Sequence, residues 1–311
     1  MSVLALSGGV GGAKLALGLY RSLPADDLRV VINTGDDFEH LGLRICPDLD
    51  TALYTLGDLE HREQGWGRRD ETWTMLRVME SLGGETWFRL GDADVALHVH
   101  RTHRLRAGAR LTEVIADITR RFSIDAQILP MTDDPVATRV MTADGELAFQ
   151  EYFVRRHCEP RLRSIRFDGA DRARPTAEVL AAFADPGLEA IVLCPSNPYL
   201  SIDPLLAIPD LRRALEARRV PAIAVSPLIG TNAVKGPTAK IMAEMGIESS
   251  PAAIATHYAG LIDALVVDDV DAASVATLPI AAFATATLMR TPEDRIRLAR
   301  FVLARARELS R

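Results

Sequence analysis

The amino-acid sequence predicts an α/β fold, in which helices cover a wound and mainly parallel sheet. Residues 3–6 form a short apolar segment, and a glycine-rich turn leads from it into a helical pattern. Similar apolar segments alternate with helical patterns again in the second half of the chain. No repeat, low-complexity segment or Pro/Ser-rich linker divides the 311 residues. We therefore expect a single domain, 1–311, with a helical insertion or lid over about 51–125 and a small antiparallel extension.

The composition argues against several classes of protein. The chain is 48% hydrophobic and 5% aromatic, so it can bury a large aliphatic core, and its net charge of −6 disfavours nonspecific binding to nucleic acid. Cys46, Cys158 and Cys194 are scattered without a CxxC pair, which argues against a disulfide framework or a structural zinc site. No apolar run has the length of a membrane span, and no basic region precedes the first apolar segment. We expect a cytoplasmic protein without a membrane partner.

The first turn of the chain is a candidate phosphate site. Residues 7–14 read Ser-Gly-Gly-Val-Gly-Gly-Ala-Lys, and bare glycine amides at the start of a helix bind phosphate or diphosphate. A Walker A loop would need Ser or Thr where Leu15 stands, and the dinucleotide fingerprint would need Gly or Ala where Lys14 stands. The alternative is a tight turn without a ligand. The candidate phosphate and nucleotide ligands are Ser7, Gly8, Gly9, Gly11, Gly12 and Lys14.

Carboxylates follow the second predicted strand, residues 28–33. Four of them lie within fifteen residues just past its end: Asp36, Asp37, Asp48 and Asp50. Because open parallel sheets bind ligands at the carboxyl ends of their strands, we expect these acids to lie opposite the phosphate loop. Oxygen ligands together with phosphate are the shell that Mg²⁺ prefers. The pattern predicts a bridging Mg²⁺, whereas the alternative is a set of surface acids without a function.

Residues 51–121 lose strand character and turn helical, which predicts the insertion or lid over the strand ends. Within them, residues 87–94 read Trp-Phe-Arg-Leu-Gly-Asp-Ala-Asp, a run on which a ring-shaped ligand could stack. The alternative is a helix entry with Asp92 as its N-cap. No HExxH pattern is present, so we expect solvent-facing or structural histidines, and no zinc site, at His98, His100 and His103.

The rest of the chain adds a hairpin and further strands. Residues 143–145 predict a hairpin between 136–142 and 146–152. Strands are predicted at 126–130, 164–167, 190–193, 222–225, 264–267 and 280–283, before a closing amphipathic helix at about 292–309. Polar turns follow two of these strands and suit nucleotide binding, although ordinary loops have the same composition. The candidate nucleotide ligands there are Ser196, Asn197, Ser226 and Gly230.

Eight motifs occur in a fixed order along the chain. Ser-Gly-Gly-Val-Gly-Gly-Ala-Lys (7–14) is followed by Asn-Thr-Gly-Asp-Asp (33–37), Cys-Pro-Asp-Leu-Asp-Thr (46–51), Gly-Trp-Gly (65–67) and Arg-Leu-Gly-Asp-Ala-Asp (89–94). The remaining three are Leu-Pro-Met-Thr-Asp-Asp-Pro (129–135), Pro-Ser-Asn-Pro (195–198) and Ser-Pro-Leu-Ile-Gly (226–230). The set covers nearly the whole chain and resembles the 2-phospho-L-lactate transferase family.

The resemblance implies a Rossmann-like fold, a homodimer and a Mg²⁺-dependent transferase of coenzyme F-420 biosynthesis. The family moves a phospho-organic-acid group from a guanosine diphosphate-type donor to the ribityl hydroxyl of the deazaflavin FO, and GMP leaves. The resemblance points to Asp37 and Asp50 as catalytic residues and metal ligands. It also points to Asp50 and Arg89 as contacts of FO, with Asp92 and Asp94 in the same run. The family more often has lysine where this chain has Arg89, which affects the geometry of that contact.

Other functions share parts of the pattern. A related group of Rossmann-like proteins has the glycine loop and the Asp-Asp turn but binds a nucleotide sugar as a non-catalytic regulatory module. That group is not expected to carry the motifs at 46–51, 65–67 and 89–94. An NAD-dependent oxidoreductase is disfavoured by Lys14 and by the lack of a ribose-binding acid.

Two points of the chemistry stay open at this stage. The donor's acid can be lactyl, enolpyruvyl or glyceryl, although residues 36–40 and 42–47 resemble bacterial members, which favours phosphoenolpyruvate. Whether Asp50 also accepts the proton of the FO hydroxyl is likewise open, because a metal ligand is a poor base.

Overall fold

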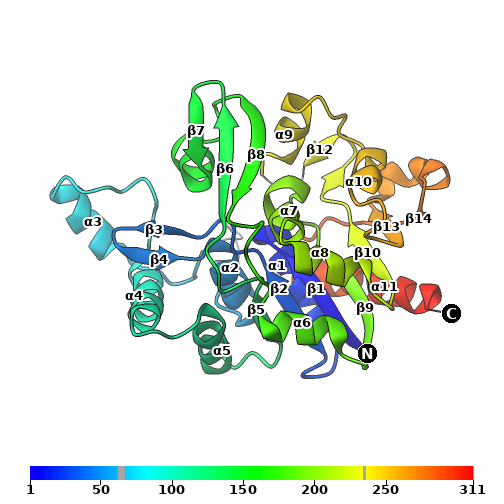
Figure 1. The fold of residues 1–311 in the computed structure, drawn as a ribbon, viewed down its shortest axis with the longest axis horizontal. Coiled ribbons are helices and arrows are strands. Elements are labelled where there is room, and N and C mark those ends of the chain that lie inside the picture. Colours follow the sequence, from blue (N-terminus) through cyan, green and yellow to red (C-terminus); the bar gives the residue numbers. More distant parts are fainter. Residues whose placement is uncertain (62–66, 234–235, 311) are drawn as a thin grey trace.

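The computed structural model describes residues 1–61, 67–233 and 236–310. Over these residues the chain forms one seven-stranded sheet in which every neighbouring pair of strands is parallel (Figure 1). The predicted α/β class is confirmed. The order across the sheet is β14 (Ala281–Ala284), β13 (Ala264–Val267), β10 (Ala222–Val225), β9 (Leu188–Leu193), β1 (Ser2–Ser7), β2 (Leu28–Ile32) and β5 (Gln127–Pro130).

Alternate residues of the strands enter two hydrophobic layers, one on each face of the sheet. In β1, Leu4 and Leu6 enter one layer and Val3 and Ala5 the other, because successive side chains of a strand point to opposite faces. The Val3 face is covered by α1 (Gly9–Tyr20), α2 (Pro47–Leu56), α5 (Leu111–Arg121) and α11 (Pro292–Leu309). The Leu4 face is covered by α6 (Ala177–Ala184), α7 (Asp203–Leu206), α8 (Pro209–Glu216), α9 (Thr238–Glu244) and α10 (Pro251–His257).

An arm extends from the body of the molecule (Figure 1). It contains the hairpin β3 (Phe38–His40) and β4 (Leu43–Ile45), and the helices α3 (Thr74–Ser81) and α4 (Asp92–Arg106). The sequence pattern does not predict this hairpin, because its strands are only three residues long. Within the segment predicted as a helical insertion, α2 and α5 pack on the sheet, whereas α3 buries none of its residues.

A separate antiparallel sheet stands above the arm in Figure 1 and consists of β6 (Ala137–Thr142), β7 (Gly145–Ala148) and β8 (Leu162–Asp168). It confirms the predicted hairpin, but the second hairpin strand is shorter than predicted. The chain turns there into a π-helical segment, η1 (Glu151–Arg155), which places Tyr152 in the core. The remaining elements are η2 (Pro198–Ile202), η3 (Asp269–Thr277), β11 (Leu228–Ile229) and β12 (Asn232–Ala233). None of the helices in the described ranges is long and apolar enough to cross a membrane.

Candidate active site at the carboxyl ends of β1, β2 and β9

The order of the strands places a topological switch point, the position of the ligand crevice in open α/β sheets, at the carboxyl ends of β1 and β9. From β1 the chain continues to β2 and β5 on one side, and it later enters β9 on the other side of β1. The helix after β1 packs on one face of the sheet, and the helices after β9 pack on the opposite face. Helices that diverge in this way mark the two strand ends between which open α/β sheets bind ligands. The predicted phosphate loop and the turn after β9 both lie at this point.

The glycine loop lies directly against the turn that follows β9. A Cβ atom on Gly11 would lie 2.4 Å from the carbonyl oxygen of Pro195, and one on Gly12 would lie 2.5 Å from Ser196 Oγ. Contacts this short do not occur for real Cβ atoms, so neither position has room for a side chain. The Gly8 amide donates a hydrogen bond to Ser196 Oγ at 3.2 Å. The two predicted nucleotide-binding segments are thus brought together, and close backbone approach explains the glycines.

A buried carboxylate already lies at the start of α1. The Gly9 amide donates to Asp48 Oδ1 at 2.8 Å, and Asn33 Nδ2 donates to Asp48 Oδ2 at 3.0 Å. Gly9 has a φ of +63°, which a glycine adopts without strain. Asp48 therefore connects the glycine loop to the end of β2. Sequence reasoning included Asp48 in the acidic cluster but assigned it no role of its own.

Burial raises the pKa of three acids beside the crevice. The pKa of Asp37 is raised to about 7 by burial, against the attraction of Arg44, whose guanidinium lies 3.2 Å from Asp37 Oδ2. Burial also raises the pKa of Asp48 to about 6, although hydrogen bonds from Asn33 and Gly9 oppose the shift. The pKa of Asp36 is raised by burial and by the nearby charge of Asp48. These three buried carboxyl groups therefore hold their protons to a higher pH than free carboxyl groups do.

Asp50, the fourth carboxylate, is held by an arginine. Arg101 Nη1 donates to Asp50 Oδ2 at 3.1 Å, and Arg101 Nη2 donates to Asp50 Oδ1, which makes the pair bidentate. Arg101 is fully buried and Asp50 is 5% exposed. The arginine comes from α4, whereas the acid lies in the first turn of α2. Sequence reasoning did not identify Arg101, because an arginine on a helix ordinarily indicates a solvated face.

Several buried polar atoms around the crevice have no hydrogen-bond partner. Among the described residues, they include atoms that follow β1, β2 and β9: Ser7 Oγ, Thr34 Oγ1, Asp37 Oδ1 and Asn197 Nδ2. Asn197 is oriented by its other side-chain atom, because Oδ1 accepts hydrogen bonds from the amides of Tyr199 and Leu200. Buried polar groups are nearly always paired in proteins. Four orphans at neighbouring strand ends therefore indicate a polar ligand at this position.

The acids also fit, in part, the Mg²⁺ that the family resemblance implies. Asp37 Oδ1 is a buried oxygen without a partner, and the cations paired with these acids include Arg44, beside Asp37, and Arg101, beside Asp50. Asp50 fits less directly, because both of its oxygens accept from Arg101. Within the described part of the chain, no three His, Cys, Asp or Glu side chains group as a metal site. A cation here would need further ligands from phosphate or water, as is usual for Mg²⁺.

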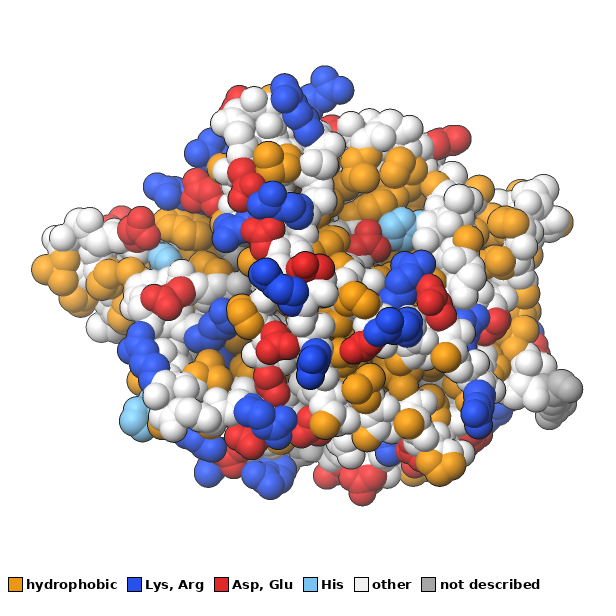
Figure 2. Space-filling model, in the orientation of Figure 1, with side chains coloured by type: hydrophobic (Ala, Val, Ile, Leu, Met, Phe, Trp, Pro, Cys, Tyr) orange, Lys and Arg blue, Asp and Glu red, His pale blue; other side chains and the backbone are white. Residues whose placement is uncertain are grey.

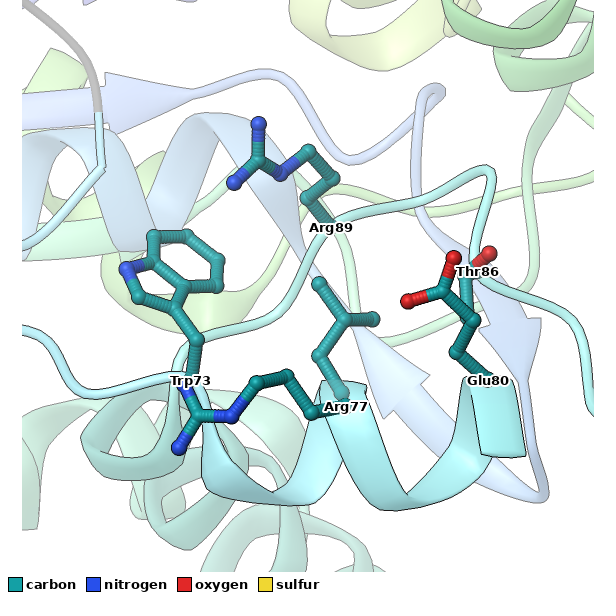
Figure 3. A pocket seen from close by; sticks show the side chains of 6 residues that line it. Trp73, Arg77, Glu80, Thr86 and Arg89 are labelled. Atoms are coloured by element: carbon teal, nitrogen blue, oxygen red, sulfur yellow. The ribbon is translucent and has the colours of Figure 1, made fainter. Parts of the chain in front are cut away.

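The predicted FO-binding run, residues 87–94, lies in the arm. Arg89 is exposed and its guanidinium stacks over the ring of Trp73, 4.7 Å from the ring centre (Figure 3). Both residues line a shallow cavity of about 440 Å³ beside α3, together with Leu76, Arg77, Glu80 and Thr86.

Asp92 accepts hydrogen bonds within the arm, whereas Asp94 connects the arm to α2 in the body. Asp92 caps α3 although it lies after that helix in the sequence, because its carboxylate accepts hydrogen bonds from the amides of Thr74 and Met75 at 3.0 and 2.9 Å. The N-cap of its own helix, α4, is Gly91, so Asp92 caps a different helix from the one considered in the sequence. Asp94 accepts a hydrogen bond from the hydroxyl of Tyr54.

The three candidate histidines differ in burial. His98 is buried in α4 beside Asp50 and Asp94, at 3.7 and 3.3 Å, whereas the other two are exposed, at positions His100 and His103. A buried histidine between carboxylates belongs to the network of the site, and the exposed pair lies outside it.

An aromatic cluster lies in the arm and is contacted by Arg155 of η1. Phe38 and His40 of β3 contact Trp87 and Phe88, with centroid distances of 4.9 Å for Phe38–Phe88 and 5.2 Å for His40–Trp87. Arg155 of η1 lies over the Trp87 ring at 5.9 Å. Figure 2 shows hydrophobic side chains gathered between the arm and the antiparallel sheet. The structure thus places both aromatic residues of the predicted run in one cluster of rings.

The remaining predicted nucleotide ligands have partners of their own. Lys14 Nζ donates to the carbonyl of Met289 at 3.2 Å, and Ser226 Oγ accepts from the amide of Leu228 at 3.2 Å. Gly230, at a φ of +61°, donates from its amide to Asp271. Gly65 and Trp66 of the Gly-Trp-Gly motif, and Lys235 in the loop after Ser226, lie outside the described residues.

Comparison with known proteins gives a consistent result. The family model described as 2-phospho-L-lactate transferase CofD matches residues 3–290. A phosphoenolpyruvate transferase of Kitasatospora aureofaciens is 41% identical, over 99% of this chain and 99% of its own. A 2-phospho-L-lactate transferase of Methanosarcina acetivorans is 38% identical, over 97% of this chain and 98% of its own.

Solved structures support the fold. A UPF0052 family protein from Bacillus halodurans superimposes with a TM-score of 0.62 over 97% of this chain and 98% of its own, at 13% identity. A likeness at this identity shows the shared fold alone. The match of the family model and the two sequence relatives goes further and confirms the resemblance predicted from the motifs: the chain belongs to the 2-phospho-L-lactate transferase CofD family.

Proposed function

We propose that this protein transfers a phosphoenolpyruvyl or 2-phospholactyl group from a guanosine diphosphate-type donor to the ribityl hydroxyl of the deazaflavin FO. GMP is released, and the product is a precursor of coenzyme F-420. The observation that supports the proposal is the set of partnerless buried atoms of Ser7, Thr34, Asp37 and Asn197 at the crevice. The names of the two sequence relatives supply the two candidate acids. We further propose a cytoplasmic homodimer.

The donor would bind with its diphosphate at the start of α1. The first turn of a helix leaves amides without intrahelical partners, and Val10 and Gly11 carry such amides next to the Gly8 and Gly9 amides that the protein itself engages. Ser7 Oγ and Asn197 Nδ2 add two polar groups from the flanking strand ends. The guanosine end would then lie towards the turns that contain Ser226 and Gly230.

The chemistry needs charge neutralisation and positioning more than a strong acid. The FO hydroxyl oxygen attacks the phosphorus that bears the organic acid, the bond from this phosphorus to the GMP oxygen breaks, and the hydroxyl proton passes to water. GMP is a phosphate monoester with a second pKa near 6, so it leaves without a general acid. Mg²⁺, held by Asp37 and Asp50, would neutralise the diphosphate charge. Asp37 offers its partnerless Oδ1, and Asp50 is oriented by Arg101.

The acceptor would lie between the acids and the aromatic cluster. The deazaflavin ring is flat and would stack on Trp87 or Phe88, with Arg89 at its edge and the ribityl chain directed at Asp50. Asp92 and Asp94 would contribute by fixing the arm, since the carboxylate of Asp92 accepts hydrogen bonds within it and that of Asp94 accepts one from Tyr54 of α2.

The reaction is tested by supplying FO, Mg²⁺ and each guanosine diphosphate-linked donor in turn and identifying the product by mass. We expect one donor to yield the FO adduct and GMP in equal amounts. Absence of an adduct with all three donors, lactyl, enolpyruvyl and glyceryl, would contradict the proposal. A thermal-shift comparison of FO with UDP-sugars distinguishes the regulatory alternative, because stabilisation by the sugar nucleotides alone would favour it.

A further inference from the structure

Arg101 is the largest fully buried side chain among the described residues, and no motif of the sequence includes it. Its guanidinium donates to both oxygens of Asp50 and, from Nη1, to the backbone carbonyl of Arg44 at 3.2 Å. Arg44 in turn pairs with Asp37 through its own guanidinium. One buried cation therefore contacts Asp50 directly and is connected to Asp37 through Arg44, and these are the two acids to which the proposed function assigns the metal.

Stability alone does not explain this arrangement. Burying two charges costs several kcal/mol per ion, and apolar residues of similar volume often give an equally stable protein. Asp50 lies in the first turn of α2, where the helix dipole already favours a carboxylate without an arginine. What a bidentate arginine adds is a fixed plane and a fixed distance for the carboxylate.

The guanidinium is itself held in place by other residues of α4. His98 Nδ1 lies 3.3 Å from Arg101 Nη1, and because arginine carries only donors, this nitrogen acts as the acceptor. His98 Nε2 then faces Asp94 Oδ2 at 3.3 Å, and Asp94 accepts from Tyr54 of α2. Positions 94, 98 and 101 share one face of a helix, because they are spaced by four and three residues. The network thus joins α4 to α2 at the site.

We propose that Arg101 is a positioning residue for the transfer reaction. It holds the Asp50 carboxylate in one orientation, and through the Arg44 carbonyl it fixes the backbone of the residue that pairs with Asp37. The inference rests on the proposed function. Arg101 is fully buried and acts through Asp50, without touching the substrate.

The protein contains a matched control for a merely structural role. Arg295 of α11 is 4% exposed and forms a buried ion pair with Glu60 at 2.5 Å. This pair lies past the carboxyl end of α2 and beside Gly18 near the end of α1, whereas the site lies at the start of both helices. Loss of Arg295 leaves the buried carboxylate of Glu60 without its ion-pair partner, just as loss of Arg101 does for Asp50, but Glu60 lies outside the site.

The experiment compares Arg101→Met, Arg101→Lys and Arg295→Met for kcat, KM for FO, and melting temperature. We expect Arg101→Met to lower kcat on the order of 100-fold, the size of a misplacement by about 1 Å, with KM changed less. Arg101→Lys should restore part of kcat. Arg295→Met should lower the melting temperature as much as Arg101→Met does but leave kcat near the wild-type value. Equal losses of kcat in both methionine variants would overturn the inference.

A structural readout keeps the inference separate from the proposed function. In a crystal structure of Arg101→Lys, which retains the charge and is expected to fold, the Asp50 side chain should leave its wild-type rotamer. An unchanged Asp50 would overturn the positioning role even if activity fell. Failure of the wild-type protein to modify FO with every donor would instead contradict the proposed function, and the Asp50 rotamer would still decide the role of Arg101.

Discussion

Asp48 accepts a hydrogen bond from the amide of Gly9 at 2.8 Å, so the amino end of α1 carries a carboxylate from the protein itself. The same carboxylate accepts from Asn33 at the end of β2. The glycine loop is therefore held in its conformation by residues that are distant in the sequence. A diphosphate at this position would use the amides and side chains that the protein leaves unpaired.

The glycine loop should not tolerate a single methyl group. Gly11→Ala would place a Cβ 2.4 Å from the Pro195 carbonyl oxygen, and the backbone would have to shift. Overpacking of this kind costs about 1–3 kcal/mol of stability and would move the strand ends that form the crevice. Denaturant unfolding and nucleotide binding measure both effects. Gly187→Ala is the control, because its nearest contact is the Asp185 carboxylate at 3.3 Å, and equal nucleotide affinities in both variants would contradict the prediction.

Stability should depend on pH through Asp37. Its pKa is about 7 in the folded protein and about 4 in the unfolded chain, so the folded state binds the proton more tightly. The stabilisation from this proton is complete below about pH 4 and is lost as the pH rises through 7. Asp37→Asn should therefore raise the melting temperature more at pH 8 than at pH 5. A gain that is equal at both pH values, or larger at pH 5, would show that the carboxyl group is not the cause.

Two ways of removing the Asp50 charge should both abolish activity but differ in their effect on stability. Asp50→Asn should abolish turnover and also lower stability by about 3–5 kcal/mol, because Arg101 is left buried without its partner. The pair of changes Asp50→Leu and Arg101→Met removes both charges and should recover most of that stability without recovering turnover. Turnover assays and denaturant unfolding are the two measurements. Substantial activity in either protein would remove Asp50 from the mechanism.

Two acids, Asp92 and Glu71, should each stabilise the first turn of one helix of the arm. Asp92, the first residue of α4, accepts from amides at the start of α3, and Glu71 accepts from the Ala93 and Asp94 amides at the start of α4. Asp92→Ala should therefore increase hydrogen exchange at the start of α3, and Glu71→Ala at the start of α4, while exchange in β1 stays unchanged. Exchange that rises equally throughout the molecule would mean that the caps are not local.

The sequence predicts the parts of the site that depend on local pattern. The glycine loop, the Asp-Asp turn and the Pro-Ser-Asn turn follow apolar strands, and the parallel sheet brings their ends together. Arg101 could not be predicted in the same way, because Asp50 lies 51 positions earlier in the chain and the pairing depends on how α4 packs near α2. Lys14 is a residue that the local pattern does suggest as a phosphate ligand, because it stands beside the glycines. In the structure, however, its ammonium group donates to the Met289 carbonyl.

The hairpin β3–β4 carries residues of both halves of the proposed site. Phe38 and His40 belong to the aromatic cluster, and Arg44 contacts Asp37 in the acidic one. A ligand that orders the aromatic end would change the free energy of binding at the acidic end. Thermodynamic linkage requires the effect to be reciprocal and of equal size. Acceptor and cation should therefore bind cooperatively.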